Sequence, residues 1–288
     1  MDDGRETPFG VWLVDKPAGP TSHDVVATIR RGLPPGTRVG HAGTLDPFAT
    51  GLLLVLVGQA TRLVPYLTAL DKTYLTRVRL GATSASGDPE GPIEPTGRAL
   101  PGAGAVSAAV AALHGPRRQR VPALSAVKVG GERLYKRTRR GEATELPERD
   151  IDVASARVVD ADLADGWLDL EVRVSKGTYI RQLVSDLGDD LGCGGYCETL
   201  RRTAVGPLRV EDAVAPADVT ARGGIDPLAA LAGLDRRDLE PDEAADVRHG
   251  RPVAGTAHGP AALVADGRLI AVAHPRDDGT LRPKVVLA

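Results

Sequence analysis

The feature that most constrains the fold of this chain is an unbroken run of aliphatic residues at positions 52–57. Successive side chains of a strand point to opposite faces of a sheet, so a strand that is apolar throughout must be covered on both faces. The run therefore predicts a fully buried strand. It follows directly on the turn Asp46-Pro47, which places a carboxylate at one end of that strand. Loops at such ends often carry functional side chains.

The rest of the hydrophobic pattern predicts strands and helices in a mixed order. Strands are expected at 11–14, 74–80 and 168–174, and helices over 106–113, from a cap at Ser22 and near Ile180. Residues 81–104 are rich in Gly, Pro and Ser and are expected to form a loop. Because the order is not a regular βαβ repeat, the sequence favours an α+β fold with a mixed, mainly antiparallel sheet.

A change of composition near Arg222-Gly223-Gly224 indicates a domain boundary. Beyond it, two apolar runs are joined by Asp266-Gly267, which is a strong hairpin signal. We therefore expect a main domain at 8–222 and a small, mostly β module at 225–288.

Charge is unevenly distributed along the chain. The formal net charge of −2 argues weakly against binding to nucleic acid. Between residues 117 and 140, however, one acid, Glu132, stands against nine basic residues: Arg117, Arg118, Arg120, Lys128, Arg133, Lys136, Arg137, Arg139 and Arg140. A phosphate backbone requires a local basic patch and not a basic average, so this stretch is either a phosphate-binding surface or a solvated charged face.

Several classes of protein are disfavoured by what the sequence lacks. Cys193 and Cys197 have no second cysteine pair and no histidine nearby, so a zinc site is not expected. The polar N-terminus does not resemble a signal peptide, and no apolar run reaches transmembrane length. Nucleotide-binding and nucleophile-elbow motifs are missing. We expect a soluble cytoplasmic protein whose reaction needs neither a metal nor another cofactor.

Two residues carry the strongest chemical indications. Asp46 is either an ordinary turn residue or an acid placed at the end of the sheet. Arg181 falls in the first turn of its helix, where the helix dipole disfavours a cation. Its guanidinium therefore either bends back to solvent or binds an anion, which would be a phosphate or a carboxylate such as that of Asp46.

Four further residues have alternative readings. Tyr74 lies on the apolar face of its strand, so it is either a core residue or a substrate contact. Tyr179 is suited to stacking on an RNA base, because RNA recognition commonly places unstacked bases on aromatic rings. Lys16 is a phosphate ligand or a turn lysine, and His41 is a structural residue or a substrate contact.

Taken together and in order, five blocks of this sequence resemble the bacterial TruB-type tRNA pseudouridine synthases. The resemblance covers roughly residues 8 to 215, and a looser one, around Arg248-His249-Gly250-Arg251-Pro252, links the tail to the PUA-like RNA-binding modules of the family. The blocks are Gly10-Val11-Trp12-Leu13-Val14-Asp15-Lys16-Pro17, Gly40-His41-Ala42-Gly43-Thr44-Leu45-Asp46-Pro47-Phe48-Ala49-Thr50-Gly51, Asp71-Lys72-Thr73-Tyr74, Ser175-Lys176-Gly177-Thr178-Tyr179-Ile180-Arg181 and Leu200-Arg201-Arg202.

The resemblance implies that uridine 55 in the TΨC loop (T-arm) of tRNA is converted to pseudouridine by a monomer that needs no cofactor or protein partner. Asp46 would be the catalytic carboxylate, and pairing with Arg181 would favour its ionised form. Tyr74 would stack on the target base. The other substrate contacts implied are His41, Tyr179, Leu200 and Lys16. One departure is Leu124, which stands where an aromatic residue is common in the family.

Two other functions fit parts of the pattern. One is a tRNA-binding module or RNA-folding chaperone without turnover, and a pure binder would not need a carboxylate among phosphates. The other is a pseudouridine synthase for a different RNA or within a guide-RNA complex. The compact tail, without long extensions, disfavours dependence on a guide.

Overall fold

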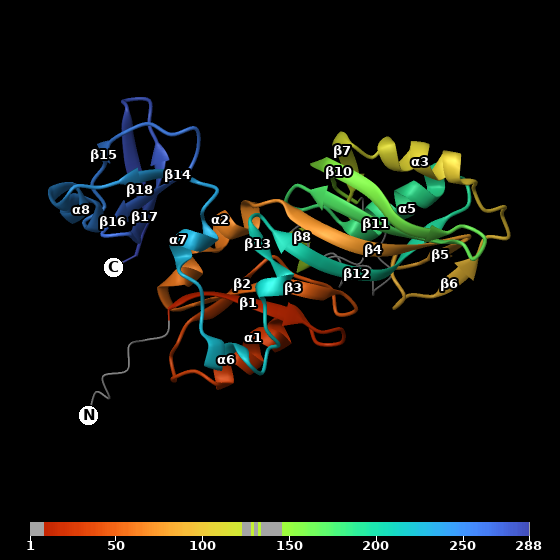
Figure 1. Ribbon diagram of the computed structural model, residues 1–288, viewed down its shortest axis with the longest axis horizontal. Helices are drawn as coiled ribbons and strands as arrows, with labels where there is room; N and C mark the ends of the chain where they lie inside the picture. The colour runs from red at the N-terminus through yellow and green to blue at the C-terminus, as the bar shows by residue number, and fades with distance from the viewer. Residues whose placement is uncertain (1–8, 123–127, 130–131, 134–145, 288) are drawn as a thin grey trace. The chain divides into compact units, whose positions relative to one another are not determined.

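The structure of the chain is a computed structural model that describes residues 9–122, 128–129, 132–133 and 146–287. It divides into two compact units, and each is described by itself. The first is built from the described parts of Met1–Pro47, Gly51–Ala69 and Val205–Ala288, and the second from those of Phe48–Thr50 and Leu70–Ala204. Figure 1 shows the order of the elements along the chain.

The first unit contains the expected apolar strand. β3 (Thr50–Val57) pairs antiparallel with β1 (Gly10–Lys16), from Gly10 opposite Val57 to Lys16 opposite Gly51, and with β2 (Val39–Ala42). All six side chains at 52–57 are 0% exposed, which confirms a strand covered on both faces. A short 3-10 helix (Gly58–Leu63) and α2 (Val64–Ala69) follow β3.

Helix α1 (Ser22–Arg31) begins one residue earlier than its sequence suggests. Ser22 was expected as the cap, and this expectation is wrong. The cap is Thr21, whose hydroxyl accepts a hydrogen bond from the Asp24 N–H (3.1 Å), while the Asp24 carboxylate accepts one from the Thr21 N–H (2.9 Å). This reciprocal pair is a capping box. It frees Ser22, the first helical residue, to point into the interior.

The segment after residue 205 returns to β1. Val11 and Ile225 exchange two backbone hydrogen bonds, from Ile225 N–H to Val11 O (2.8 Å) and from Val11 N–H to Ile225 O (3.2 Å). A Cβ atom on Gly224 would lie 2.1 Å from Cδ1 of Trp12, so only glycine fits this close approach. The short elements here are β13 (Leu208–Arg209), a 3-10 helix (Val210–Asp212), α6 (Val219–Arg222) and α7 (Pro227–Ala230).

The C-terminal part of the first unit is a five-stranded sheet in the order β14-β16-β17-β18-β15. Asp266 (φ 50°) and Gly267 (φ 72°) join β16 to β17, as the left-handed conformation at both turn positions of a tight hairpin requires. The hairpin expected from the sequence is therefore confirmed. The elements are β14 (Asp235–Asp238), α8 (Pro241–Arg248), β15 (Val253–Ala254), β16 (Ala261–Ala265), β17 (Arg268–Pro275) and β18 (Thr280–Val286).

The second unit contains an antiparallel sheet in the order β12-β4-β11-β10-β7, against which α3 and α5 pack. In β4 every second residue is buried, as expected from its alternation. The interval 81–104 is not only loop, because it forms the small hairpin β5–β6. The elements are β4 (Lys72–Leu80), β5 (Ala82–Ser84), β6 (Ile93–Pro95), α3 (Ala103–Ala111), β7 (Gly115–Arg120), β8 (Lys128–Val129), β9 (Glu132–Arg133), β10 (Glu148–Asp162), β11 (Trp167–Val174), α5 (Ile180–Asp190) and β12 (Gly195–Val205).

The mixture of antiparallel sheets and helices confirms the α+β class. Parallel pairing occurs between β14 and β16. Among the described helices, none has both the length and the apolar character of a membrane span.

Candidate active site

The loop that carries Asp46 is held on its N-terminal side by a buried serine. Leu45, 3% exposed, donates its N–H to Oγ of Ser22 (2.9 Å), and the Ser22 hydroxyl donates to the Leu45 carbonyl (3.1 Å). One side chain thus satisfies both backbone groups of Leu45, as a neighbouring strand would. Asp46 itself is partly exposed, although the backbone of the residue before it is held in the interior.

On its C-terminal side the same loop is held by Lys16. This lysine is 0% exposed, and its ammonium donates to the carbonyl oxygens of Pro17 (2.8 Å) and Pro47 (3.1 Å). The Pro47 carbonyl also accepts the N–H of Gly19 (2.9 Å). The phosphate contact expected of Lys16 does not match this placement, because its ammonium is buried and donates to carbonyl oxygens of the loop. Lys16 instead holds the backbone beside Asp46. We therefore assign Lys16 to the support of the loop.

His41 lies at the end of β2, close to the Asp46 loop in sequence. Its ring meets that of His23, from α1, edge to face, with centroids 5.2 Å apart and an interplanar angle of 82°. The partly exposed ring is thus braced by a second ring, which suits a side chain that contacts substrate and fits a structural role equally well.

Arg181 occupies the first turn of α5 in the second unit, and a carboxylate lies beside it. Its guanidinium donates to the carbonyl of Ser86 (2.7 Å) and pairs with Asp88 (3.1 Å). Both charged side chains are only 5% exposed. Asp88 is therefore one anion beside Arg181 within this unit, and the pairing of Arg181 with Asp46 suggested by the sequence stays a prediction.

Asp88 was not identified from the sequence. Its carboxylate also accepts hydrogen bonds from the Ser86 hydroxyl and from the Glu90 N–H (3.1 Å). It lies in an interval that reads as loop and contains no motif. The available signal was indirect: an arginine in the first turn of a helix favours an acid nearby, and the interval 81–104 holds three acids, Asp88, Glu90 and Glu94.

The other expected contacts of the second unit lie on α5, β4 and β12. Tyr179 is the residue before α5, and the guanidinium carbon of Arg149 lies 5.1 Å from the centre of its ring. Tyr74 (8% exposed) and Leu200 (6% exposed) belong to neighbouring strands. Tyr179 and Arg181 are thus two residues apart at the start of α5, and Tyr74 and Leu200 lie on paired strands of the same sheet.

A buried lysine lies beside Tyr74 in the sequence. Lys72, on β4, is 6% exposed and donates to the Leu70 carbonyl (2.6 Å). Burial, and then the charge of Arg202, lowers the pKa of Lys72 from 10.5 to about 8. Arg202, 1% exposed, is another buried cation of this sheet.

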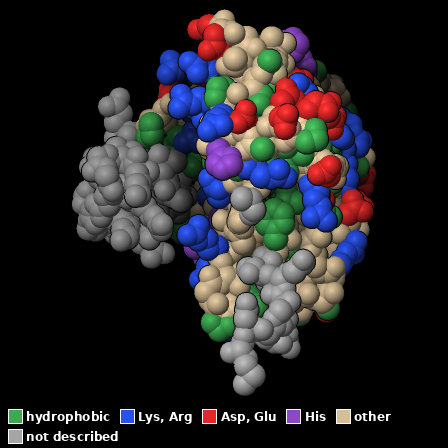
Figure 2. Space-filling model, turned by 90° about the vertical axis from the view of Figure 1, so that its left-hand side faces the viewer, with side chains coloured by type: hydrophobic (Ala, Val, Ile, Leu, Met, Phe, Trp, Pro, Cys, Tyr) green, Lys and Arg blue, Asp and Glu red, His purple; other side chains and the backbone are tan. Residues whose placement is uncertain are grey.

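The basic stretch at 117–140 is only partly described. Arg117 donates to the carbonyl of Ala112, and Arg118 pairs with Glu148 (3.0 Å). On the face shown in Figure 2, lysine and arginine side chains lie beside acidic ones, in keeping with the small net charge. Of the residues named from this stretch in the sequence analysis, Leu124, Lys136, Arg137, Arg139 and Arg140 lie outside the described residues.

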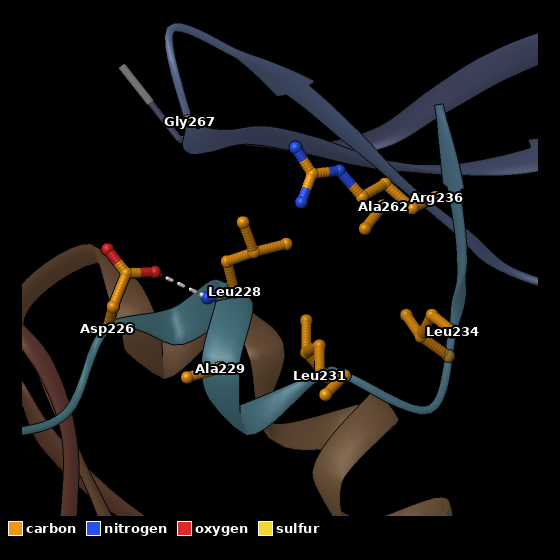
Figure 3. Close-up of a pocket in the computed structure, with 9 residues that line it drawn as sticks. Asp226, Leu228, Ala229, Leu231, Leu234, Arg236, Ala262 and Gly267 are labelled. Atoms are coloured by element: carbon orange, nitrogen blue, oxygen red, sulfur yellow. Dashed lines mark hydrogen bonds between the residues drawn. The ribbon is translucent and has the colours of Figure 1, made fainter. Parts of the chain in front are cut away.

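Two other features of the described residues bear on where a site could lie. Within the described ranges, no group of three or more His, Cys, Asp or Glu side chains is placed to hold a metal ion. A cavity of about 520 Å³ lies between α7 and the C-terminal sheet, lined largely by leucine and alanine (Figure 3). Its polar groups are already engaged, since Asp226 accepts the Leu228 N–H (2.6 Å) and Arg236 pairs with Asp238 (2.6 Å).

Comparison with known protein families matches most of the chain to pseudouridine synthase domains. Residues 30–180 match the model of the TruB family pseudouridylate synthase N-terminal domain. Residues 181–223 match the tRNA pseudouridylate synthase B C-terminal domain, and residues 234–288 match the C-terminal domain of tRNA pseudouridine synthase II.

Two individual relatives match this chain over nearly its full length. The chain is 46% identical to tRNA pseudouridine synthase B of Thermobifida fusca (strain YX), over 97% of this chain and 98% of that protein. It is 44% identical to the protein of that name from Parasynechococcus marenigrum (strain WH8102), over 97% of each. Its fold is similar to that of a solved archaeal box H/ACA sRNP Nop10-Cbf5 complex (TM-score 0.73, 24% identity, 99% of this chain and 89% of the other).

Proposed function

Because the chain belongs to the TruB family of pseudouridine synthases, and so is an isomerase that forms pseudouridine in tRNA, we propose that its target is uridine 55 in the T-arm and that Asp46 is the catalytic carboxylate. The observation that carries the proposal is the Asp46 loop. Buried groups of Ser22 and Lys16 hold the backbone on both sides of this acid, while Asp46 itself stays partly exposed.

The reaction is an isomerisation that adds and removes nothing. The bond between N1 of uracil and C1′ of ribose breaks, the base rotates in the site, and C5 forms a new bond to C1′. The proton on C5 is then lost and N1 gains one, so the atoms balance. The ionised carboxylate of Asp46 would begin the sequence by attack on the sugar, by attack on the base, or by assisting glycal formation.

Arg181 and Asp88 extend the proposed catalytic set. A guanidinium held by a buried carboxylate and a carbonyl cannot reorient freely, so it offers a fixed positive charge without reorganisation during the reaction. We propose that this charge stabilises Asp46 and the negative charge that develops on the departing uracil.

The remaining residues would hold the extruded base. Taking a base out of its stack costs on the order of a few kcal/mol, which contacts in the site must offset. We propose that Tyr74 stacks on the uracil and that His41, Tyr179 and Leu200 contact the surrounding nucleotides. Their aromatic and apolar surfaces suit this task because every base has a stacking face.

We further propose that the chain acts as a monomer and that residues 225–288 and the basic stretch at 117–140 bind tRNA phosphates. Binding of Z phosphates releases counterions, so the logarithm of the affinity should fall linearly with the logarithm of the salt concentration. A flat salt response in a filter-binding titration would exclude a phosphate-binding role for the basic stretch.

The direct test is modification of a defined transcript. Purified protein is incubated with an unmodified tRNA transcript in the absence of added metal or nucleotide, and pseudouridine is mapped by carbodiimide chemistry. We expect one new pseudouridine, at position 55, and none at that site in a matched transcript with cytidine 55. Modification at a different position would leave the family assignment intact and refute the assignment of uridine 55.

A further inference from the structure

A buried glutamine holds the backbone at the start of α5. Gln119, on β7, is 1% exposed. Its side-chain N–H donates to the carbonyl of Tyr179 (3.0 Å), and its side-chain oxygen accepts the N–H of the same residue (2.8 Å). The carboxamide therefore satisfies both backbone groups of Tyr179 and has only one orientation that can do so.

The hydrogen bonds from Gln119 act at the residue where α5 begins. It is the N-cap of α5 and has an extended backbone (φ −96°, ψ 110°), but no side chain caps the helix there. The Tyr179 carbonyl already accepts the first helical hydrogen bond, from Leu183 N–H (3.0 Å). The bonds from Gln119 thus fix the direction in which the helix begins, and Arg181 is only two residues further on.

A second side chain contacts the same segment at Gly177 and Tyr179. Arg149, on β10, lies directly opposite Gln119 in the strand register. Its guanidinium donates to the Gly177 carbonyl (3.0 Å) and lies against the Tyr179 ring at 5.1 Å. Gly177 has a positive φ of 82°, and a Cβ there would come within 3.1 Å of the Arg149 guanidinium. One cross-strand pair therefore holds the turn into α5 at both Gly177 and Tyr179.

We propose that Gln119 is a positioning residue for pseudouridine formation: its carboxamide sets the backbone of Tyr179, and through it the placement of the Tyr179 ring and of the Arg181 guanidinium. Arg149 assists from the opposite strand. The proposal rests on the proposed roles of Tyr179 and Arg181. Gln119 itself is too buried to touch RNA, so its effect must pass through this segment.

The kinetic test uses Gln119→Met, which keeps the length of the side chain and removes both hydrogen bonds. A displacement of about 1 Å at a reacting group can cost on the order of 100-fold in rate, so we expect the single-turnover rate constant at saturating enzyme to fall roughly 10- to 100-fold. The dissociation constant for tRNA should change less than the rate constant, because the buried Gln119 side chain makes no contact with tRNA itself. An unchanged rate constant would refute the proposal.

Gln182→Met is the matched control. Gln182 follows Arg181 directly, but its amide donates to Asp186 (2.7 Å) within the same helix and does not hold the turn. We expect this variant to keep the parent rate. In the background of Arg181→Lys, the effect of Gln119→Met should shrink, because residues that act through one group are not additive. Full additivity would show that Gln119 acts independently of Arg181.

Hydrogen exchange tests the positioning without relying on activity. The first N–H groups of a helix have no acceptor within the helix and normally exchange quickly. In the parent protein we expect the Tyr179 amide to exchange more slowly than those of Ile180, Arg181 and Gln182. In Gln119→Met this protection should be lost while the thermal midpoint stays close to that of Gln182→Met.

The activity assay and the hydrogen-exchange measurement test the proposed function and the positioning role separately. A parent protein that leaves tRNA unmodified would refute the proposed function, whereas an unprotected Tyr179 amide would refute the positioning role whatever the activity. Should Gln119→Met fail to fold, the exchange rates of the parent protein still decide the second point.

Discussion

Replacing Asp88 by alanine should destabilise the protein far more than its position in a loop suggests. The Asp88 and Arg181 side chains are both 5% exposed, and the guanidinium retains its charge when its partner is removed. Breaking a buried pair by removing one member typically costs about 3–5 kcal/mol, because the charge that remains in the interior has lost a close counter-charge. Against a total stability of about 5–15 kcal/mol, this loss is large.

The assay is urea unfolding followed by circular dichroism at pH 7, with Asp165→Ala as the matched control. Asp165 also pairs with an arginine, Arg79 at 3.1 Å, but its side chain is 66% exposed. An exposed pair contributes about 0–1 kcal/mol, so the control should unfold close to the parent. Equal losses in the two variants would refute the claim that burial makes the Asp88 pair important.

A double variant sharpens the same reasoning. A larger apolar replacement, Asp88→Leu, should also lower the free energy of unfolding. If this loss comes from the charge that remains on Arg181, then the double variant Asp88→Leu with Arg181→Met should recover part of it. A double variant that is less stable than Asp88→Leu would instead show that each side chain makes its own separate contribution.

Three further expectations follow from other contacts. Ser22→Ala removes the hydrogen-bond partner of the buried N–H and C=O of Leu45, so it should lower the free energy of unfolding in urea by about 1–3 kcal/mol and slow pseudouridine formation. Unchanged stability and rate would contradict the claim that Ser22 supports the Asp46 loop. The pKa of Lys72 is lowered from 10.5 to about 8, so between these pH values the unfolded chain binds a proton that the folded chain lacks. The free energy of unfolding should therefore rise with pH over this range, by up to about 3 kcal/mol relative to Lys72→Met. Parallel pH profiles of the two proteins would contradict this. Gly224→Ala places a Cβ against the Trp12 ring and should lower the thermal midpoint through overpacking of about 1–3 kcal/mol, and a midpoint equal to the parent's would mean that the ring moves freely.

Much of the fold could be predicted because local patterning and burial agree. The aliphatic run of β3, the alternation of β4 and the Asp266-Gly267 hairpin each carry their own periodicity or turn chemistry, and all three are confirmed. The cap of α1 could not be assigned so securely. Thr21 and Ser22 are both good caps, and the choice depends on Leu45, which is distant in sequence and needs the Ser22 hydroxyl.

The supports of the candidate site were harder to predict than its proposed chemical groups. Asp46 and Arg181 stand in recognisable blocks, whereas Asp88 and Gln119 act through contacts 93 and 60 residues away in the chain. For Lys16 the sequence left a phosphate ligand and a turn lysine as alternatives, and the structure buries it against carbonyl oxygens. Only tertiary structure reveals that a side chain holds the backbone of another segment.

The central claim is that Asp46 carries out the chemistry, and the most direct measurement compares Asp46→Asn with the parent protein. Single-turnover formation of pseudouridine in an unmodified tRNA transcript is measured beside tRNA binding, with the exposed aspartate variant Asp212→Asn as the control. Because asparagine keeps the shape and removes the charge, the account expects Asp46→Asn to bind tRNA normally and form no pseudouridine. Conversion at the parent rate by Asp46→Asn would contradict it.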